Sequence, residues 1–170
     1  IDMKIVMVPE DRKIMGFIPE RSIIENISLP HLDKLSRVGY VNKRKEYDLA
    51  YKYYETFNIK SKNEWSHVST LSGGNQQKVV VSKWLMGDPD VIILDEPTRG
   101  IDVGAKYEIY VLINQLASQG KAVLMISSEL PEIIGMSHRI LVMREGQIVS
   151  ELENSNISQE KIMYHATGGK

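Results

Sequence analysis

Residues 91–96 read VIILDE, four apolar residues followed directly by two acids. A continuous apolar run of this kind is typical of a strand buried on both faces of a parallel sheet. Open α/β sheets bind ligands at the carboxyl ends of such strands, and successive strand residues point to opposite faces. We therefore expect Asp95 to hold a magnesium ion, usually through water, and Glu96 to orient or deprotonate a water molecule. Taken alone, the motif fits a strand end with two solvated acids equally well.

Strand and helix patterns alternate on both sides of this run. Strands are predicted over residues 3–8 and 122–126, the second of them another buried strand, and helices over residues 75–86 and 103–117. This alternation favours an α/β fold with a mainly parallel sheet flanked by helices. Residues 10–19 are polar and interrupted by glycine and proline, so we expect a loop there.

Residues 20–70 have a different pattern and are predicted to be mostly helical. Ser22 and Glu25 stand at capping-box spacing and should open a helix that ends before Pro30. A second, amphipathic helix is indicated by apolar residues at three- and four-residue spacing, which are expected to face the core. These residues are Tyr47, Ala50, Tyr54 and Phe57. The pattern predicts a helical subdomain inserted into the α/β core.

The C-terminal part is predicted to hold short elements. Ser128 can cap a short helix that ends near Gly135. Residues 140–143 and 147–150 flank a turn and favour a hairpin, and a last helix is expected to start at Ser158. The expected division of the chain is into residues 1–19, 20–70, 71–150 and 151–170.

Composition limits the classes of function. The formal net charge is −1 over 170 residues, which gives no electrostatic reason to expect nucleic-acid binding. The chain has no cysteine, so disulfide frameworks and thiolate metal sites are excluded. No apolar run approaches the roughly 20 residues of a membrane-spanning helix, so any role at a membrane is expected to come through a partner. The chain begins with Ile1 rather than Met and lacks a signal-peptide pattern, which suggests a cut or processed fragment.

The second informative stretch, residues 71–77, reads LSGGNQQ and leads into the helix predicted for residues 75–86. Two glycines before a helix allow the backbone to approach a ligand closely. The helix start offers free N–H groups and the positive end of the helix dipole, and the Ser72 hydroxyl adds a donor. The stretch therefore predicts a compact phosphate site. A turn followed by a capped helix explains the Ser-Gly-Gly part alone.

Taken in order, these stretches resemble the ABC ATPase family. Residues 71–77 resemble its signature motif, residues 91–96 its Walker B strand and residues 98–102 its D-loop, and residues 126–129 lie where its switch loop belongs. Finer features resemble the second nucleotide-binding half of monosaccharide importers of the galactose or methyl-galactoside, ribose or xylose type. These features are residues 9–13, 98–106 and 127–129.

The resemblance implies a P-loop NTPase-like fold with a helical subdomain insertion, and ATP and Mg²⁺ as cofactors. It implies that Asp95 holds the metal and that Glu96 is catalytic. The residues it implies at the nucleotide are Ser72, Gly73, Gly74, Asn75, Gln76, Glu10, Asp102 and Glu129. In this family each nucleotide site uses the P-loop of one half and the signature motif of the other. Ser72 and the two glycines would therefore clamp the γ-phosphate of ATP bound to a partner half.

The resemblance also implies partners and a location. The full-length protein is expected to hydrolyse ATP and to power the import of a monosaccharide from the cytoplasmic face of the cell membrane. The expected partners are a second ATPase half fused in the same polypeptide, membrane permease subunits and, indirectly, a periplasmic or extracellular sugar-binding protein. The loop at residues 10–19 and the helix from Ser22 would contact the permease.

The sequence departs from the family pattern in several places. No stretch matches the P-loop motif G-x-x-x-x-G-K-[ST], so the N-terminal part of the core is missing and the chain by itself is expected to be inactive. Glu10 stands where most members have Gln. Glu129 stands where they have His, and a carboxylate there would repel the γ-phosphate. Without an inner strand between residues 122–126 and 140–143, the chain would close the gap, swap strands with another copy or displace its C-terminal strands.

Two other functions stay open. One is a non-enzymatic, degenerate ABC module for dimerisation or regulation, which the missing P-loop favours for the isolated chain. The other is an ABC ATPase outside transport, acting in DNA repair or on ribosomes. Such proteins usually carry long coiled coils or basic segments, and the sequence contains neither.

Overall fold

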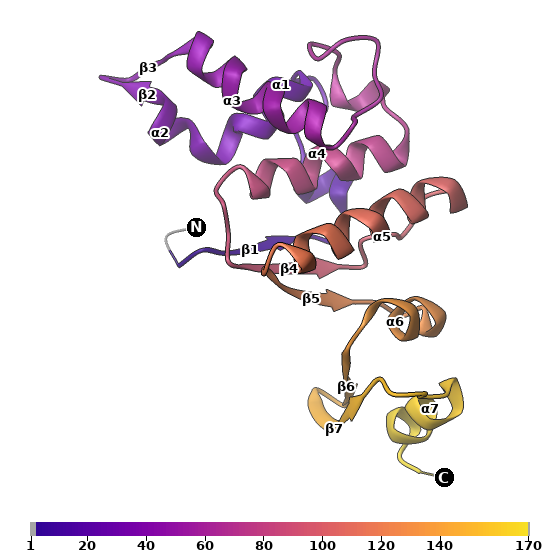
Figure 1. Ribbon diagram of the computed structural model, residues 1–170. Helices are drawn as coiled ribbons and strands as arrows, with labels where there is room; N and C mark the ends of the chain where they lie inside the picture. Colours follow the sequence, from indigo (N-terminus) through magenta and orange to yellow (C-terminus); the bar gives the residue numbers. More distant parts are fainter. Residues whose placement is uncertain (1–2, 170) are drawn as a thin grey trace. The chain divides into compact units, whose positions relative to one another are not determined.

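The computed structural model describes residues 3–169 and divides into two compact units, Ile1–Ile126 and Ser127–Lys170 (Figure 1). The first unit contains a small parallel sheet, several short helical segments and three long helices. The second unit contains a hairpin and two helices. No helix within residues 3–169 is long and apolar enough to span a membrane.

The sheet of the first unit has three parallel strands in the order β1-β4-β5. The strands are β1 (Ile5–Val8), β4 (Val91–Asp95) and β5 (Ala122–Ile126). All three were predicted from their apolar runs. The central strand β4 carries the two acids at its end, as expected.

The two faces of this sheet differ in burial. On one face Val6, Val8, Ile92 and Leu94 are buried, because α4 packs on β1 and α5 packs on β5. On the other face the side chains of β5 are half exposed, with Leu124 46% and Ile126 44% accessible. The prediction that residues 122–126 form a buried strand was therefore wrong. β5 is the last strand of its sheet within the described residues and is covered on one side only.

The helical subdomain follows β1 and was predicted in outline. Its elements are α1 (Ile23–Ser28), a 3₁₀ turn at Leu29–His31, α2 (Leu32–Leu35), the short strands β2 (Ser36–Arg37) and β3 (Tyr40–Val41), and α3 (Lys43–Thr56). The capping box at Ser22 and Glu25 is present, and α1 ends before Pro30. The β2–β3 hairpin was not predicted. In the expected stripe of α3, Ala50 is fully buried and the aromatic residues are only partly buried.

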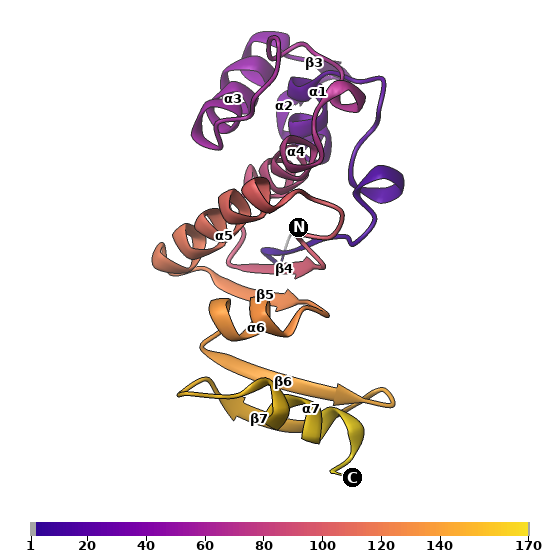
Figure 2. The ribbon, with the colours of Figure 1, turned by 90° about the vertical axis from the view of Figure 1, so that its right-hand side faces the viewer.

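Helix α4 (Gly73–Leu85) forms the centre of the first unit. It contacts α1 and α3 on one side and β1 and α5 (Val103–Ser118) on the other, and both views show it between these two groups (Figures 1 and 2). Every residue from Gln76 to Lys83 is buried. Burial of this length on all sides stabilises the helix through packing rather than through its intrinsic propensity.

Residues 10–19 were predicted as a loop, but they contain a turn of π-helix, η1 (Arg12–Gly16). Asp11 caps the turn because its carboxylate accepts hydrogen bonds from the backbone N–H groups of Lys13 (2.9 Å) and Ile14 (3.1 Å). At its other end Gly16 lies against Val80 of α4, where an added Cβ would come within 2.9 Å of a Val80 methyl group. The segment is thus more ordered than its polar sequence indicated.

The second unit is built around the hairpin of β6 (Arg139–Arg144) and β7 (Gln147–Glu153), which was predicted. Helices α6 (Leu130–Met136) and α7 (Gln159–Thr167) accompany it, and its core contains Ile140, Val142, Ile157 and Ile162. Ser158 caps α7 as expected, through the N–H of Lys161. Within the described part of the chain β6 pairs only with β7, and β5 pairs only with β4.

The predicted cap of α6 was wrong. Glu129, not Ser128, occupies the N-cap position, and its side chain makes no capping hydrogen bond. The Ser127 hydroxyl accepts the N–H of Glu129 at 3.1 Å instead.

Candidate functional site

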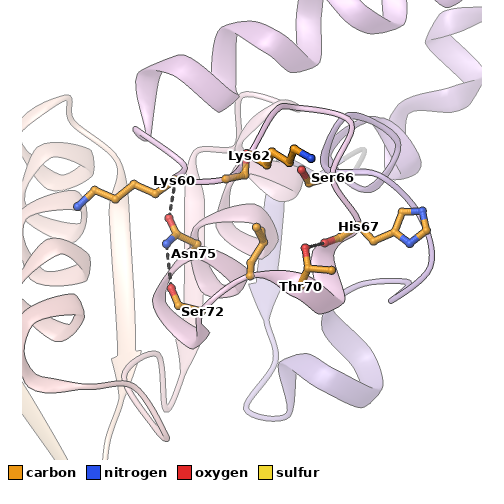
Figure 3. A pocket seen from close by; sticks show the side chains of 9 residues that line it. Lys60, Lys62, Ser66, His67, Thr70, Ser72 and Asn75 are labelled. Atoms are coloured by element: carbon orange, nitrogen blue, oxygen red, sulfur yellow. Dashed lines mark hydrogen bonds between the residues drawn. The ribbon is translucent and has the colours of Figure 1, made fainter.

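The start of α4 carries the residues of the predicted phosphate site. Ser72 occupies the N-cap position in an extended conformation and is exposed, but its side chain does not cap the helix. The Asn75 side-chain amide donates to Ser72 Oγ (2.9 Å), and Asn75 Oδ1 accepts the backbone N–H of Lys60 (2.7 Å), as Figure 3 shows. The Lys60 N–H can only donate, which fixes the orientation of the Asn75 amide. Within residues 3–169 no acceptor takes the Ser72 hydroxyl proton, so this donor is available to a ligand.

Gly73 and Gly74 have no Cβ, so other groups of the chain can pack closely against them. A Cβ at Gly74 would lie 2.5 Å from the Cβ of Ala105 in α5, and Gly74 is buried. A Cβ at Gly73 would lie 2.8 Å from Nη2 of Arg12 and 3.3 Å from the carbonyl oxygen of Gly100. Gly74 therefore serves helix–helix packing and Gly73 accommodates Arg12, while the approach of a ligand to the backbone of both glycines stays a prediction.

Gln76 lies inside the structure rather than at the surface. Its exposed fraction is 7%, and Nε2 donates to the carbonyl oxygens of Val68 (3.3 Å) and Leu71 (3.1 Å). These bonds hold the turn that leads into α4. Gln76 therefore shapes the site from within and does not point toward a ligand.

An open cavity of about 540 Å³ lies beside the start of α4 and is lined by residues between Lys60 and Asn75 (Figure 3). Most of the residues that line it are polar, and they include Ser72 and Asn75. The Lys60 ammonium points away from these two residues and pairs with Glu108 of α5 at 3.3 Å. The cavity thus offers hydroxyl and amide groups, while the Lys60 charge is directed elsewhere.

The two acids stand at the end of the central parallel strand, as predicted. Asp95 is the last residue of β4 and pairs in register with Ile126. Glu96 has a positive φ of 45°, and its N–H donates to the carbonyl oxygen of Ile126 at 2.9 Å. A non-glycine residue in this conformation is uncommon, and such conformations cluster at functional sites.

The number of carboxylates at the end of β4 is compatible with magnesium. The described residues contain no group of three or more His, Cys, Asp or Glu side chains that could form a metal cage. Magnesium is usually held by one or two carboxylates together with water and substrate phosphates, which fits Asp95 as a single ligand. The donor set therefore fits Mg²⁺ delivered with a nucleotide.

The loop after β1 and the loop after β4 are joined by arginines. Glu10 forms an ion pair with Arg99. Arg12 reaches across to the same loop, where Nη1 donates to the carbonyl oxygen of Arg99 (2.8 Å) and Nη2 to that of Gly100 (3.2 Å). Burial lowers the pKa of Arg12, and Asp11 opposes this shift. Arginine nevertheless stays protonated in proteins.

Sequence reasoning missed Arg12 and Lys83. The only signal for Arg12 was its place in residues 9–13, which carried part of the family resemblance. Lys83 lies on the buried surface of α4, its ammonium donates to the carbonyl oxygen of Gly16 (2.5 Å), and burial lowers its pKa. Its sequence position within a helix gave no indication of this contact.

The remaining predicted residues are separated by the fold. Asp102 is the N-cap of α5, and its carboxylate accepts the N–H of Ala105 at 3.0 Å, so it has a structural task. Glu129 is exposed and belongs to the second unit. The structure thus brings Ser72 and Asn75 together at one helix start, and Asp95 and Glu96 together at one strand end.

The chain is similar to curated sugar-import proteins. It is 52% identical over 169 residues to the ribose import ATP-binding protein RbsA of Geobacillus kaustophilus, which covers 99% of this chain and 34% of that protein. It is 55% identical to the xylose import ATP-binding protein XylG of Thermoanaerobacter pseudethanolicus, over 98% of this chain and 33% of the relative. The chain therefore spans about a third of the length of the curated relatives it matches.

Solved structures and a family model agree on the fold. The dimeric, post-hydrolysis ATP-binding cassette MJ0796 with ADP and Pi has a TM-score of 0.73 at 23% identity, over 90% of this chain and 64% of that chain. A nucleotide-free ATP-binding cassette from an ABC transporter has a TM-score of 0.75 at 21% identity, over 97% of this chain and 65% of that chain. The family model described as ABC transporter matches residues 1–99. This chain belongs to the ABC transporter family, as part of an ATP-binding domain of the kind that the family resemblance implied.

Proposed function

We propose that this chain is part of an ATP-hydrolysing subunit that powers the import of a monosaccharide, and that it supplies its signature motif to ATP held by a partner half. The observation that carries the proposal is the start of α4. Ser72 is exposed there, its hydroxyl proton has no acceptor within residues 3–169, and Asn75 holds its oxygen at 2.9 Å. Relatives named for import of ribose and xylose support the sugar class.

The start of α4 and the end of β4 have different chemical roles in this proposal. The free N–H groups and dipole at the start of α4, with the Ser72 hydroxyl, bind a terminal phosphate. Glu96 orients the attacking water, and Asp95 serves as the carboxylate ligand of the metal. Mg²⁺, when bound, neutralises charge on the phosphates. Because no P-loop motif occurs in these residues, the phosphate cradle has to come from another segment.

The proposal includes a membrane permease as partner, at the cytoplasmic face of the membrane. A cavity of about 240 Å³ supports this, since it is lined by Ile18, in the loop after η1, and by residues of the helical subdomain. Ile18, Leu29 and Leu32 contribute apolar surface to it, and Arg21, Glu25 and Lys43 contribute charges. Such a mixed, half-open groove suits a protruding segment of a protein partner. A fused second ATPase half and an external sugar-binding protein complete the proposed assembly.

The test is Ser72→Arg in the full-length protein with its permease. The bulky cation fills the space of the phosphate, so ATPase activity and sugar uptake are expected to fall to background. Ser69→Arg is the matched control, because Ser69 is also exposed but lies outside the start of α4. Near-normal transport in the Ser72 variant would overturn the proposal.

A second experiment asks which nucleotide site hydrolyses ATP. Glu129 stands where family members carry His, so the site that uses the acids of this chain is proposed to be impaired. Glu96→Gln should then reduce ATPase activity much less than the matching change in the other half. Equal losses would show that both sites hydrolyse ATP. A purely regulatory module, the alternative, predicts no loss from either Ser72→Arg or Glu96→Gln.

A further inference from the structure

Arg12 joins three segments that lie far apart in the sequence. It lies in the η1 turn. The Asp11 carboxylate stabilises the start of this turn by accepting hydrogen bonds from the backbone N–H groups of Lys13 and Ile14. The Arg12 guanidinium donates to the carbonyl oxygens of Arg99 and Gly100, 87 and 88 positions away. The side chain is half-buried, and Nε is buried without a partner within residues 3–169.

The same guanidinium also lies against the first residue of α4. A Cβ at Gly73 would come within 2.8 Å of Arg12 Nη2 and within 3.3 Å of the Gly100 oxygen. Under 3.0 Å a neighbour has to move, and the end of the Arg12 side chain is the part that can. The absence of a side chain at residue 73 thus allows Arg12 to lie between α4 and the loop after β4.

We propose that Arg12 is a positioning residue. It holds the start of α4 and the Arg99–Gly100 turn in the arrangement in which Ser72 binds a phosphate. The inference rests on the proposed function of Ser72. A planar guanidinium can donate to two carbonyl oxygens at once in a fixed geometry, whereas a lysine ammonium is a single flexible point charge. The Glu10–Arg99 ion pair is a second link between the two loops, but exposed pairs of this kind contribute little.

The first experiment compares Arg12→Lys and Arg12→Ala in the full-length protein with its permease. Both variants should raise the ATP concentration for half-maximal hydrolysis about tenfold, as expected for loss of hydrogen bonds from a charged group. The maximal rate should change much less, because the acids at the end of β4 are untouched. Lys13→Ala is the matched control, since it removes a charge from the same turn at an exposed position. Full activity of Arg12→Lys would overturn the proposal, because charge alone would then suffice.

The second experiment uses Gly73→Ala, which should displace the guanidinium without removing it. If Gly73 is a glycine for the sake of Arg12, the Arg12→Ala/Gly73→Ala double variant should be impaired no more than about twofold beyond Arg12→Ala, because contacting residues are non-additive. If the missing Cβ of Gly73 instead makes room for the ligand, the two losses should multiply, and the proposal fails. Thermal melts identify any variant that does not fold, and Arg12→Lys then carries the test.

Ser72→Arg, assayed alongside, separates the two claims. If Ser72→Arg leaves ATPase activity intact, the proposed function fails regardless of Arg12. If Ser72→Arg abolishes activity while both Arg12 variants bind and hydrolyse ATP normally, only the positioning role of Arg12 is refuted.

Discussion

Helices α4 and α5 begin with almost the same backbone conformation and use it differently. The N-cap of α4, Ser72, has φ −63° and ψ 157°, and the N-cap of α5, Asp102, has φ −67° and ψ 158°. Asp102 accepts the N–H of Ala105 and so satisfies one of the free donors of its own helix. Ser72 makes no such bond. The start of α5 is capped by the Asp102 side chain, whereas the start of α4 has no side-chain cap from its own N-cap residue.

Packing explains why α4 can do without a cap. The residues from Gln76 to Lys83 are all buried, so neighbouring elements stabilise this helix along its length. Its N-cap residue, Ser72, is exposed. In α5, four residues are buried and the outer side is exposed, so capping contributes a larger share of its stability. A helix held by its surroundings can offer an unsatisfied end to a ligand, and the following predictions test this comparison.

The largest effect is expected where the two helices touch. Gly74→Ala places a Cβ 2.5 Å from the Cβ of Ala105, and neither atom can rotate away. Overpacking of this kind costs about 1–3 kcal/mol of unfolding free energy, which denaturant titration measures. Gly104→Ala in the first turn of α5 is the control, because its nearest neighbour is 3.5 Å away. That change should stabilise the protein by about 0.5–1 kcal/mol. A Gly74 variant of wild-type stability would refute the packing explanation.

A second effect is expected from Asn75, which orients Ser72. In Asn75→Asp the carboxylate can accept both the Lys60 N–H and the Ser72 hydroxyl proton, so the donor offered to a phosphate is lost and a negative charge is added. We expect the ATP concentration for half-maximal hydrolysis to rise about tenfold, since the affected bond involves a charged group. Asn75→Ala, which leaves the hydroxyl free, should be affected less. Equal effects of both variants would show that Asn75 has only a packing role.

Substitutions at the two N-cap residues are expected to have smaller effects. One should change mainly stability and the other mainly activity. Asp102→Ala should lower the unfolding free energy by about 1 kcal/mol through loss of the cap, while Asp102→Asn keeps most of it. Ser72→Ala should hardly change stability, because Ser72 makes no cap bond, yet it should weaken ATP-dependent activity. Thermal unfolding and ATPase assays of the same samples separate the two properties. A stability loss in Ser72→Ala equal to that in Asp102→Ala would contradict the comparison.

The smallest effect concerns a third helix start, that of α1, which is closed by a reciprocal capping box. The pKa of Glu25 is lowered, chiefly by the hydrogen bond from the Ser22 backbone N–H, while burial opposes the shift. A lowered carboxylate pKa stabilises the folded state above the unfolded pKa of about 4.3, and this contribution is lost as pH falls through the folded-state pKa. The stability difference between wild type and Glu25→Gln should therefore shrink on acidification. A difference that is constant with pH would argue against an ionised cap.

Local features of this protein were determined by the sequence alone. The capping box at Ser22, the helices around residues 75–86 and 103–117, the C-terminal hairpin and the acids at the end of β4 all follow from residues a few positions apart. Hydrogen bonding and periodicity over such distances are encoded in neighbouring side chains. The sequence also showed that Asp95 and Glu96 are neighbours and that Ser72 directly precedes a helix, because these relations again involve only adjacent residues.

Only the tertiary structure decided what the glycines and the charged residues do. Gly74 meets Ala105, Gln76 turns inward, and Arg12 binds carbonyl groups 87 and 88 positions away. The exposure of β5 likewise depends on which elements cover it and not on its own apolar residues. Such contacts arise when whole helices and strands pack together, and a local pattern carries no information about which distant atoms will meet.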